Sequence, residues 1–104
     1  MTGAPLKVWP EAEADFIEAA DWYESKQAGL AHELAVEIDV ALQKIILNPE
    51  LFPIVDRDFS IRRVLVARFP YKVFFVASSE GVDVCAILHA SQDDWIVRKR
   101  LKSD

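Results

Sequence analysis

The feature that most constrains this chain is a long apolar run at residues 61–76, interrupted by Phe69-Pro70. The run is rich in β-branched and aromatic residues, which favour strands, and proline is excluded from the interior of a sheet. The connection between its two halves is too short for a parallel crossover. The run is therefore predicted to form the centre of an antiparallel sheet, which the rest of the chain must cover.

Residues 61–67, 71–77 and 82–89 are predicted to be three consecutive strands of this sheet. Only residues 68–70 and 78–81 connect them, so neighbouring strands are expected to pair antiparallel, as a meander. An alternating apolar segment at residues 6–9 predicts a further strand near the N-terminus.

Helical periodicity replaces strand alternation between the first strand and Pro49. A first helix is expected over about residues 11–25, with Pro10 in its first turn, and a second begins after Gly29 and stops at Asn48-Pro49. The short connection between them predicts an antiparallel helical hairpin. A charged segment at residues 93–101 predicts a short C-terminal helix or tail.

The predicted fold class is α+β, with the order β-α-α-β-β-β, in one domain spanning residues 1–104. The helical hairpin is expected to pack on one face of the antiparallel sheet. Strand alternation leaves both faces largely apolar, and monomers seldom expose a large apolar patch. The second face is therefore predicted to bind a partner; the alternative is that the C-terminal tail covers part of it.

The net charge of −5, from 17 acids and 12 bases, argues against bulk electrostatic binding of nucleic acid. The single cysteine, Cys85, excludes an internal disulfide and is predicted to be a buried thiol. The sequence shows no secretory signal pattern and no apolar run of the ~20 residues that a membrane span needs, so a cytoplasmic location is expected. It has no metal-ligand spacing and no phosphate-binding glycine loop, and no cofactor is predicted.

Several charged residues have two interpretations each. Arg62, Arg63 and Arg68 either solvate the edges of the sheet or bind phosphate or a partner's carboxylates, for which the guanidinium group is well suited. His89, at the end of the last strand, is either a structural histidine or an acid–base group. The carboxylate clusters at residues 11–15 and 93–94 are expected at solvated helix ends.

A series of motifs resembles the RelE/ParE superfamily of toxins, and the ParE-like, or plasmid-stabilisation, branch in particular. The motifs follow the family order over nearly the whole chain: Ala14-Asp15-Phe16, Ala19-Ala20-Asp21-Trp22-Tyr23, residues 45–53, Ile61-Arg62-Arg63, residues 69–75 and residues 86–90. The resemblance implies the toxin of a type II toxin–antitoxin pair, neutralised by a cognate antitoxin protein. The partner-binding residues expected on this basis are Arg62, Arg63, Val64, Val66, Arg68, Phe74, Arg98 and Arg100.

The resemblance also implies two alternative targets. ParE-like members inhibit DNA gyrase by protein binding, whereas RelE-like members cut mRNA in the ribosome without metal. The residues that match a cutting site here are Arg62, Arg68, Lys72 and His89. The acidic net charge, the absence of a tyrosine after Tyr71 and the segment 90–94, where ParE-like relatives carry arginines, depart from the family pattern.

We therefore favour a ParE-like toxin that acts by binding DNA gyrase rather than as a nuclease, and that binds neither membranes nor specific DNA sequences by itself. A ribosome-dependent mRNA endonuclease is the first alternative. A non-toxic module that retains only antitoxin binding is the second.

Overall fold

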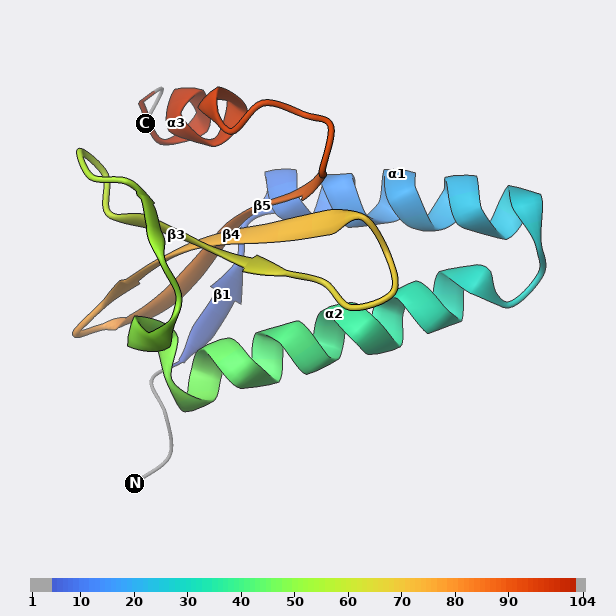
Figure 1. The fold of residues 1–104 in the computed structure, drawn as a ribbon, viewed down its shortest axis with the longest axis horizontal. Helices are drawn as coiled ribbons and strands as arrows, with labels where there is room; N and C mark the ends of the chain where they lie inside the picture. The colour runs from blue at the N-terminus through green and yellow to red at the C-terminus, as the bar shows by residue number, and fades with distance from the viewer. Residues whose placement is uncertain (1–4, 103–104) are drawn as a thin grey trace.

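The computed structural model describes residues 5–102 (Figure 1). Its fold is α+β, as predicted, with one five-stranded sheet in the order β1-β5-β4-β3-β2. The elements are β1 (Leu6–Val8), α1 (Pro10–Lys26), α2 (Leu30–Leu47), the 3-10 turn η1 (Pro49–Leu51), β2 (Ile54–Asp56), β3 (Ile61–Leu65), β4 (Tyr71–Ser78), β5 (Gly81–His89) and α3 (Trp95–Lys102).

The predicted meander is confirmed, since β3, β4 and β5 pair antiparallel in sequence order. β3 ends at Leu65, two residues earlier than expected, because the corner before β4 occupies more of the chain. In this corner the Val66 N–H donates to the Tyr71 carbonyl at 2.9 Å, and Arg68 has a left-handed backbone with φ of 71°.

Both edges of the sheet differ from the sequence prediction. β1 pairs with β5 in parallel, with Leu6 opposite Val82 and Val8 opposite Val84. β2, which the sequence analysis did not predict, pairs with β3 through Ile54 and Arg62. Both edge strands have three residues, and segments this short carry little periodic signal of their own.

A β-bulge in β5 breaks the strict alternation that we expected. Phe74 lies opposite Ala86 and Phe75 opposite Val84, so Cys85 is the additional residue on its strand. Cys85 and Ala86 therefore both belong to the core beneath α3, whereas Val84 and Ile87 face the helical hairpin. Cys85 is fully buried, as predicted.

The helical hairpin forms as predicted, with Pro10 in the first turn of α1. Gly29 (φ 95°) has the left-handed conformation that the tight connection requires. The Glu24 carboxylate accepts hydrogen bonds from the backbone N–H groups of Gly29 and Ala31 at 3.0–3.1 Å, and so caps the start of α2. From this connection the two helices spread apart along the sheet (Figure 1).

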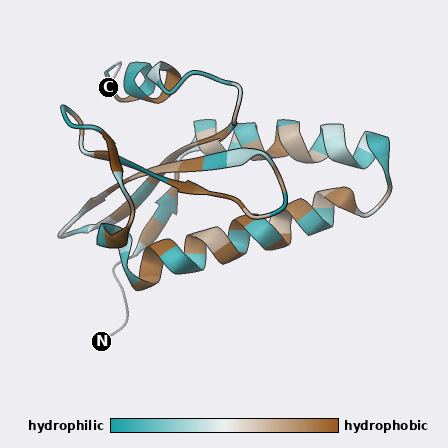
Figure 2. Ribbon diagram, viewed as in Figure 1, coloured by the Kyte–Doolittle hydropathy of each residue, from teal (hydrophilic) through white to brown (hydrophobic). Residues whose placement is uncertain are grey.

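The sheet has a core on each face, because α3 packs on the face opposite the hairpin. Figure 2 shows apolar residues along the strands, and apolar residues alternating with polar ones along the helices. The core under the hairpin contains Leu34, Ile38, Ile45, Val64, Val66, Val73, Phe75 and Val84, among others. The core under α3 contains Ile61, Phe74, Cys85, Ala86, Leu88 and Val97. The prediction of an open second face is therefore wrong, and the alternative, cover by the C-terminal segment, is right.

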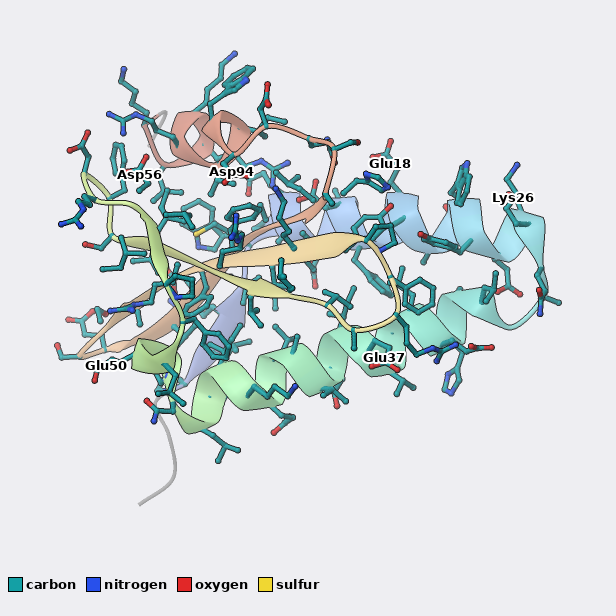
Figure 3. All side chains as sticks on the ribbon, in the orientation of Figure 1. Glu18, Lys26, Glu37, Glu50, Asp56 and Asp94 are labelled. Atoms are coloured by element: carbon teal, nitrogen blue, oxygen red, sulfur yellow. The ribbon has the colours of Figure 1, made fainter. Side chains whose placement is uncertain are left out.

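Ion pairs attach α3 to the sheet and to α1. Before the helix, Asp94 accepts from Lys72 at 2.9 Å and lies 3.7 Å from Arg63 (Figure 3). Within the helix, Arg98 binds Asp56 and Asp58 at 2.8 and 2.7 Å. A shift of α3 would break several charge-assisted hydrogen bonds at once.

Candidate functional site

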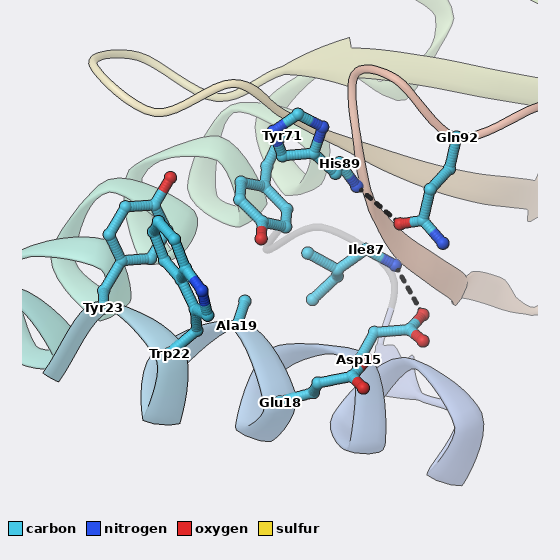
Figure 4. A pocket seen from close by; sticks show the side chains of 9 residues that line it. All are labelled: Asp15, Glu18, Ala19, Trp22, Tyr23, Tyr71, Ile87, His89 and Gln92. Carbon is cyan, nitrogen blue, oxygen red and sulfur yellow. Dashed lines mark hydrogen bonds between the residues drawn. The ribbon is translucent and has the colours of Figure 1, made fainter. Parts of the chain in front are cut away.

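A cavity of about 360 Å³ opens between α1 and the neighbouring ends of β4 and β5 (Figure 4). Its walls combine two carboxylates with four rings and one amide: Asp15, Glu18, Trp22, Tyr23, Tyr71, His89 and Gln92, with Ala19 and Ile87 between them. A cavity of this size with a few convergent polar groups has the characteristics of a binding site.

Asp15 forms one side of the cavity and is already committed to structure. Its carboxylate accepts the Ile87 N–H at 3.0 Å and binds Arg100 through two hydrogen bonds at 2.7 and 2.9 Å. The expectation that Asp15 is part of a solvated helix end is therefore wrong. The hydrogen bonding of Arg100 to the Asp15 carboxylate is the largest factor that raises the pKa of Arg100.

His89 is held in one orientation at the end of β5. The Ser91 N–H donates to His89 Nδ1 at 3.0 Å, and the Ser91 hydroxyl lies 2.8 Å from the same nitrogen. An Nδ1 that accepts a backbone N–H places the imidazole proton on Nε2 in the neutral ring. The ring also meets Tyr71 edge-on, with centroids 5.3 Å apart.

Tyr71 lies at the centre of the aromatic wall, in edge-on contact with Tyr23 as well as with His89. Burial raises the pKa of the Tyr71 hydroxyl, and electrostatic interactions with Tyr23 and Glu18 raise it further. Tyr71 therefore stays protonated at neutral pH and retains both a donor and an acceptor.

A second, more apolar hollow of about 380 Å³ lies on the other side of α1, where the two helices spread apart. The sheet contributes Val8 and Ile87 to its lining, and the two helices contribute one acid each, Glu13 and Asp39. Its remaining lining residues are Phe16, Ile17, Ala35, Ile38 and Leu42. We call this feature the hairpin groove. Ile17 is 57% exposed beside it, which is high for an isoleucine.

Most of the predicted partner-binding cations have ligands within the chain. Arg62 donates to the backbone carbonyls of Phe52 and Glu50, and Arg68 binds both Glu33 and Glu37 on α2. These contacts, with those of Arg63, Arg98 and Arg100 above, anchor loops and helices to the sheet. The hydrogen bond to Glu33 is the largest factor that raises the pKa of Arg68, and that to Asp58 plays the same part for Arg98.

The three apolar residues predicted to bind a partner are buried. Val64 and Val66 lie in the core under the hairpin and are 7% exposed, and Phe74 lies under α3 and is fully buried. Exposure of all three at one open surface is therefore excluded in this conformation.

The four candidate nuclease residues do not converge. Arg68 lies against α2 on the hairpin side of the sheet, and Lys72 is buried with Asp94 on the α3 side. His89 faces the cavity, whereas Arg62 holds the η1 loop. The structure thus brings none of these four side chains together around one phosphate-sized space.

The sequence analysis did not select the residues that form the cavity, apart from His89. Trp22 and Tyr23 were noted only as parts of family motifs, and Asp15 was also assigned to a solvated helix end. Their spacing of seven and eight along one helix nevertheless predicts a shared side. Within residues 5–102, no helix is long and apolar enough to cross a membrane. In the same range no three His, Cys, Asp or Glu side chains gather to hold a metal ion.

This fold, a sheet covered by a helical hairpin on one face and a short helix on the other, is shared with a solved structure of a ParDE system, in agreement with the resemblance that the motifs indicated. In particular, the chain is similar to a chain of the solved structure "Chromosomal ParDE TA system from P. aeruginosa", with a TM-score of 0.73. The two are 16% identical, and the match covers 83% of this chain and 95% of the other. At this identity the likeness establishes the fold. No protein-family model and no curated protein matches the sequence.

Proposed function

We propose that this chain is a ParE-like toxin domain of a type II toxin–antitoxin pair. It acts by binding protein, with DNA gyrase as its target in the cytoplasm, and a cognate antitoxin neutralises it. The observation that carries the proposal is the fold shared with a chain of a ParDE complex over 83% of the sequence. The family motifs that run in order along the chain support the same conclusion.

The placement of the cations favours binding over RNA cleavage. In cleavage of the RelE kind, a base, an acid and charge-stabilising groups must act on one phosphate. Arg68 and Lys72 instead face carboxylates on opposite sides of the sheet. A rearrangement that gathered them would have to break these ion pairs.

The hairpin groove is the docking surface that we propose for the antitoxin. Its apolar floor suits the apolar side of an amphipathic segment, and Glu13 and Asp39 suit basic residues at the margins of that segment. This arrangement reverses the charges that we expected from sequence. The partner's basic residues meet the toxin's acids, because the acids of the toxin already pair with four of the arginines: Arg63, Arg68, Arg98 and Arg100.

Inducible expression of the chain without its partner in a bacterial host tests the proposed function. Growth arrest, together with inhibition of supercoiling by purified gyrase, supports it. Growth arrest with cleaved transcripts and uninhibited gyrase would support the endonuclease alternative instead. Normal growth at equal expression would support the non-toxic module that only binds the antitoxin. The variant Lys44→Ala, at an exposed position on α2, should be as toxic as the wild type and controls for expression.

Co-expression with the protein encoded by the neighbouring reading frame tests the antitoxin separately. The two proteins should elute together on gel filtration, and growth should recover. Separate elution would contradict an antitoxin at that locus.

A further inference from the structure

The cavity beside α1 differs from the hairpin groove in the chemistry of its walls. Trp22 and Tyr23 meet edge-on with centroids 4.9 Å apart, and Tyr71 and His89 continue the aromatic wall across the cavity (Figure 4). Aromatic faces carry partial negative charge and attract cations. The Trp22 ring already holds one cation on the outside, the Lys26 ammonium 5.1 Å from its centroid.

The two carboxylates of the cavity, Asp15 and Glu18, differ in whether they already have a counter-ion. Arg100 neutralises Asp15, and the Asp15 oxygens accept three hydrogen bonds. Glu18, one turn further along α1, has no ion pair or side-chain hydrogen bond within the part of the chain that the structure describes. The cavity therefore has aromatic walls and one carboxylate that lacks a counter-ion.

We propose that this cavity binds an arginine side chain of a protein partner, stacked between the aromatic rings and paired with Glu18. A planar guanidinium group can lie on a ring while its edge donates two parallel hydrogen bonds to a carboxylate. A lysine ammonium forms the ion pair but does not stack as a plane, so arginine is preferred. A phosphate group is disfavoured because it would meet the charge of Glu18 without a cation to offset it.

The proposal deepens the proposed function, since it names one side chain that the protein partner inserts. It can still be tested without any partner. The probe is N-acetyl-arginine methylamide, titrated against the full chain at constant ionic strength, and the neutral isostere is N-acetyl-citrulline methylamide. The readouts are the NMR signals of the Trp22 indole N–H and of the Gln92 side-chain amide.

We expect saturable shifts with the arginine probe, with a dissociation constant on the order of millimolar, because a single side chain supplies all the contacts. Glu18→Gln should weaken binding about threefold to fivefold, as expected for one exposed ion pair. Trp22→Ala, confirmed as folded by circular dichroism, should weaken it at least as much, because the stacking surface is lost. Glu11→Gln, also an exposed acid of α1 but outside both this cavity and the hairpin groove, should bind like the wild type.

Three results would overturn the proposal. The first is no saturable shift up to about 50 mM probe, a range that reaches well past millimolar binding. The others are equal shifts with the citrulline probe, or equal losses of affinity in Glu18→Gln and Glu11→Gln. The growth assay fails independently of this titration. A chain that binds the arginine probe but never arrests growth would refute the proposed toxin function and support the cavity assignment. A chain that arrests growth but does not bind the probe would support the toxin function and refute the cavity assignment.

Discussion

Arg100 on α3 binds the carboxylate of Asp15 on α1 through both terminal nitrogens, although the two residues lie 85 positions apart. Arg100 also donates to the Cys85 carbonyl at 3.1 Å, and Asp15 accepts the Ile87 N–H at 3.0 Å. β1 ends at Val8, opposite Val84. Beyond Val84, β1 no longer runs beside β5. There Arg100 and Asp15 supply the hydrogen-bond partners for the backbone of β5.

Replacement of Arg100 by alanine should lower the free energy of unfolding by about 2–3 kcal/mol, because it leaves the largely buried Asp15 carboxylate without its counter-ion. Urea denaturation measures the change. Lys102→Ala, at an exposed position on the same helix, should stay within about 0.5 kcal/mol of the wild type. Equal effects of the two substitutions would show that the ion pair contributes nothing to stability.

The pair of Lys72 and Asp94 should respond unequally to removal of each partner. Asp94→Ala leaves the buried Lys72 ammonium without its carboxylate and should cost about 2–3 kcal/mol. Lys72→Met leaves Asp94, which is 40% exposed and lies near Arg63, and should cost about 1 kcal/mol or less. Thermal unfolding of both variants checks the order, and a larger loss in Lys72→Met would contradict it.

Protonation of Glu24 should lower the free energy of unfolding at acidic pH. Hydrogen bonds from the Gly29 N–H, and then from the Ala31 N–H, lower the pKa of the Glu24 carboxyl. A carboxylate whose folded pKa is lowered contributes its stabilisation above the unfolded pKa and loses it as pH falls through the folded pKa.

Glu24→Gln retains an acceptor oxygen but removes the charge. Its urea midpoint should lie below that of the wild type at pH 7, and the difference should disappear at pH values below the folded pKa of Glu24. Asp21→Asn, on the exposed side of the same helix, should leave the acidic limb of the profile unchanged. A difference that persisted at low pH would assign the effect to something other than charge.

Gly81 and Gly29 both have positive φ, but only Gly81 touches another strand. A Cβ at Gly81 would lie 2.5 Å from the Pro5 carbonyl oxygen, where β1 begins, whereas one at Gly29 would meet nothing within 4 Å. Gly29→Ala should cost about 1 kcal/mol from backbone strain alone. Gly81→Ala should cost about 3 kcal/mol, because β1 must also move. Chemical denaturation of both variants gives the comparison, and equal costs would show that β1 shifts easily.

Ile17→Asp should disrupt antitoxin binding if the hairpin groove is the docking surface. A charge placed on the apolar lining opposes the burial of a partner's apolar side chains, and we expect binding to weaken by at least about tenfold. Val36→Asp is the matched control, since Val36 is 46% exposed on α2 but lies outside the groove. Calorimetry with the co-expressed partner measures both. Loss of affinity in the control alone would move the interface to the outer side of α2.

The sequence predicted the parts of this fold that depend on local patterns. Pro10 and Gly29 bound the first helix and the hairpin turn, because their backbone preferences act within a few residues. The Phe69-Pro70 corner separates two strands for the same reason. The α3 segment was also detected, but its position on the second face of the sheet was only an alternative.

The roles of the charged residues were decided by tertiary structure. The acids that bind Arg68, Lys72, Arg98 and Arg100 lie between 22 and 85 positions away from them. Hydrophobic periodicity carries no information on such partners, so it could not show that these arginines bind acids of their own chain.

Period and turn chemistry along the chain were enough to predict the order of the helices and of the strands other than β2, together with the central meander and its apolar residues. The short strand β2, the parallel pairing of β1, the bulge at Cys85, the cover of the second face by α3 and the aromatic cavity beside Glu18 became visible only in the folded chain. Each of these depends on contacts between segments distant in the chain, where geometry and charge select the partner.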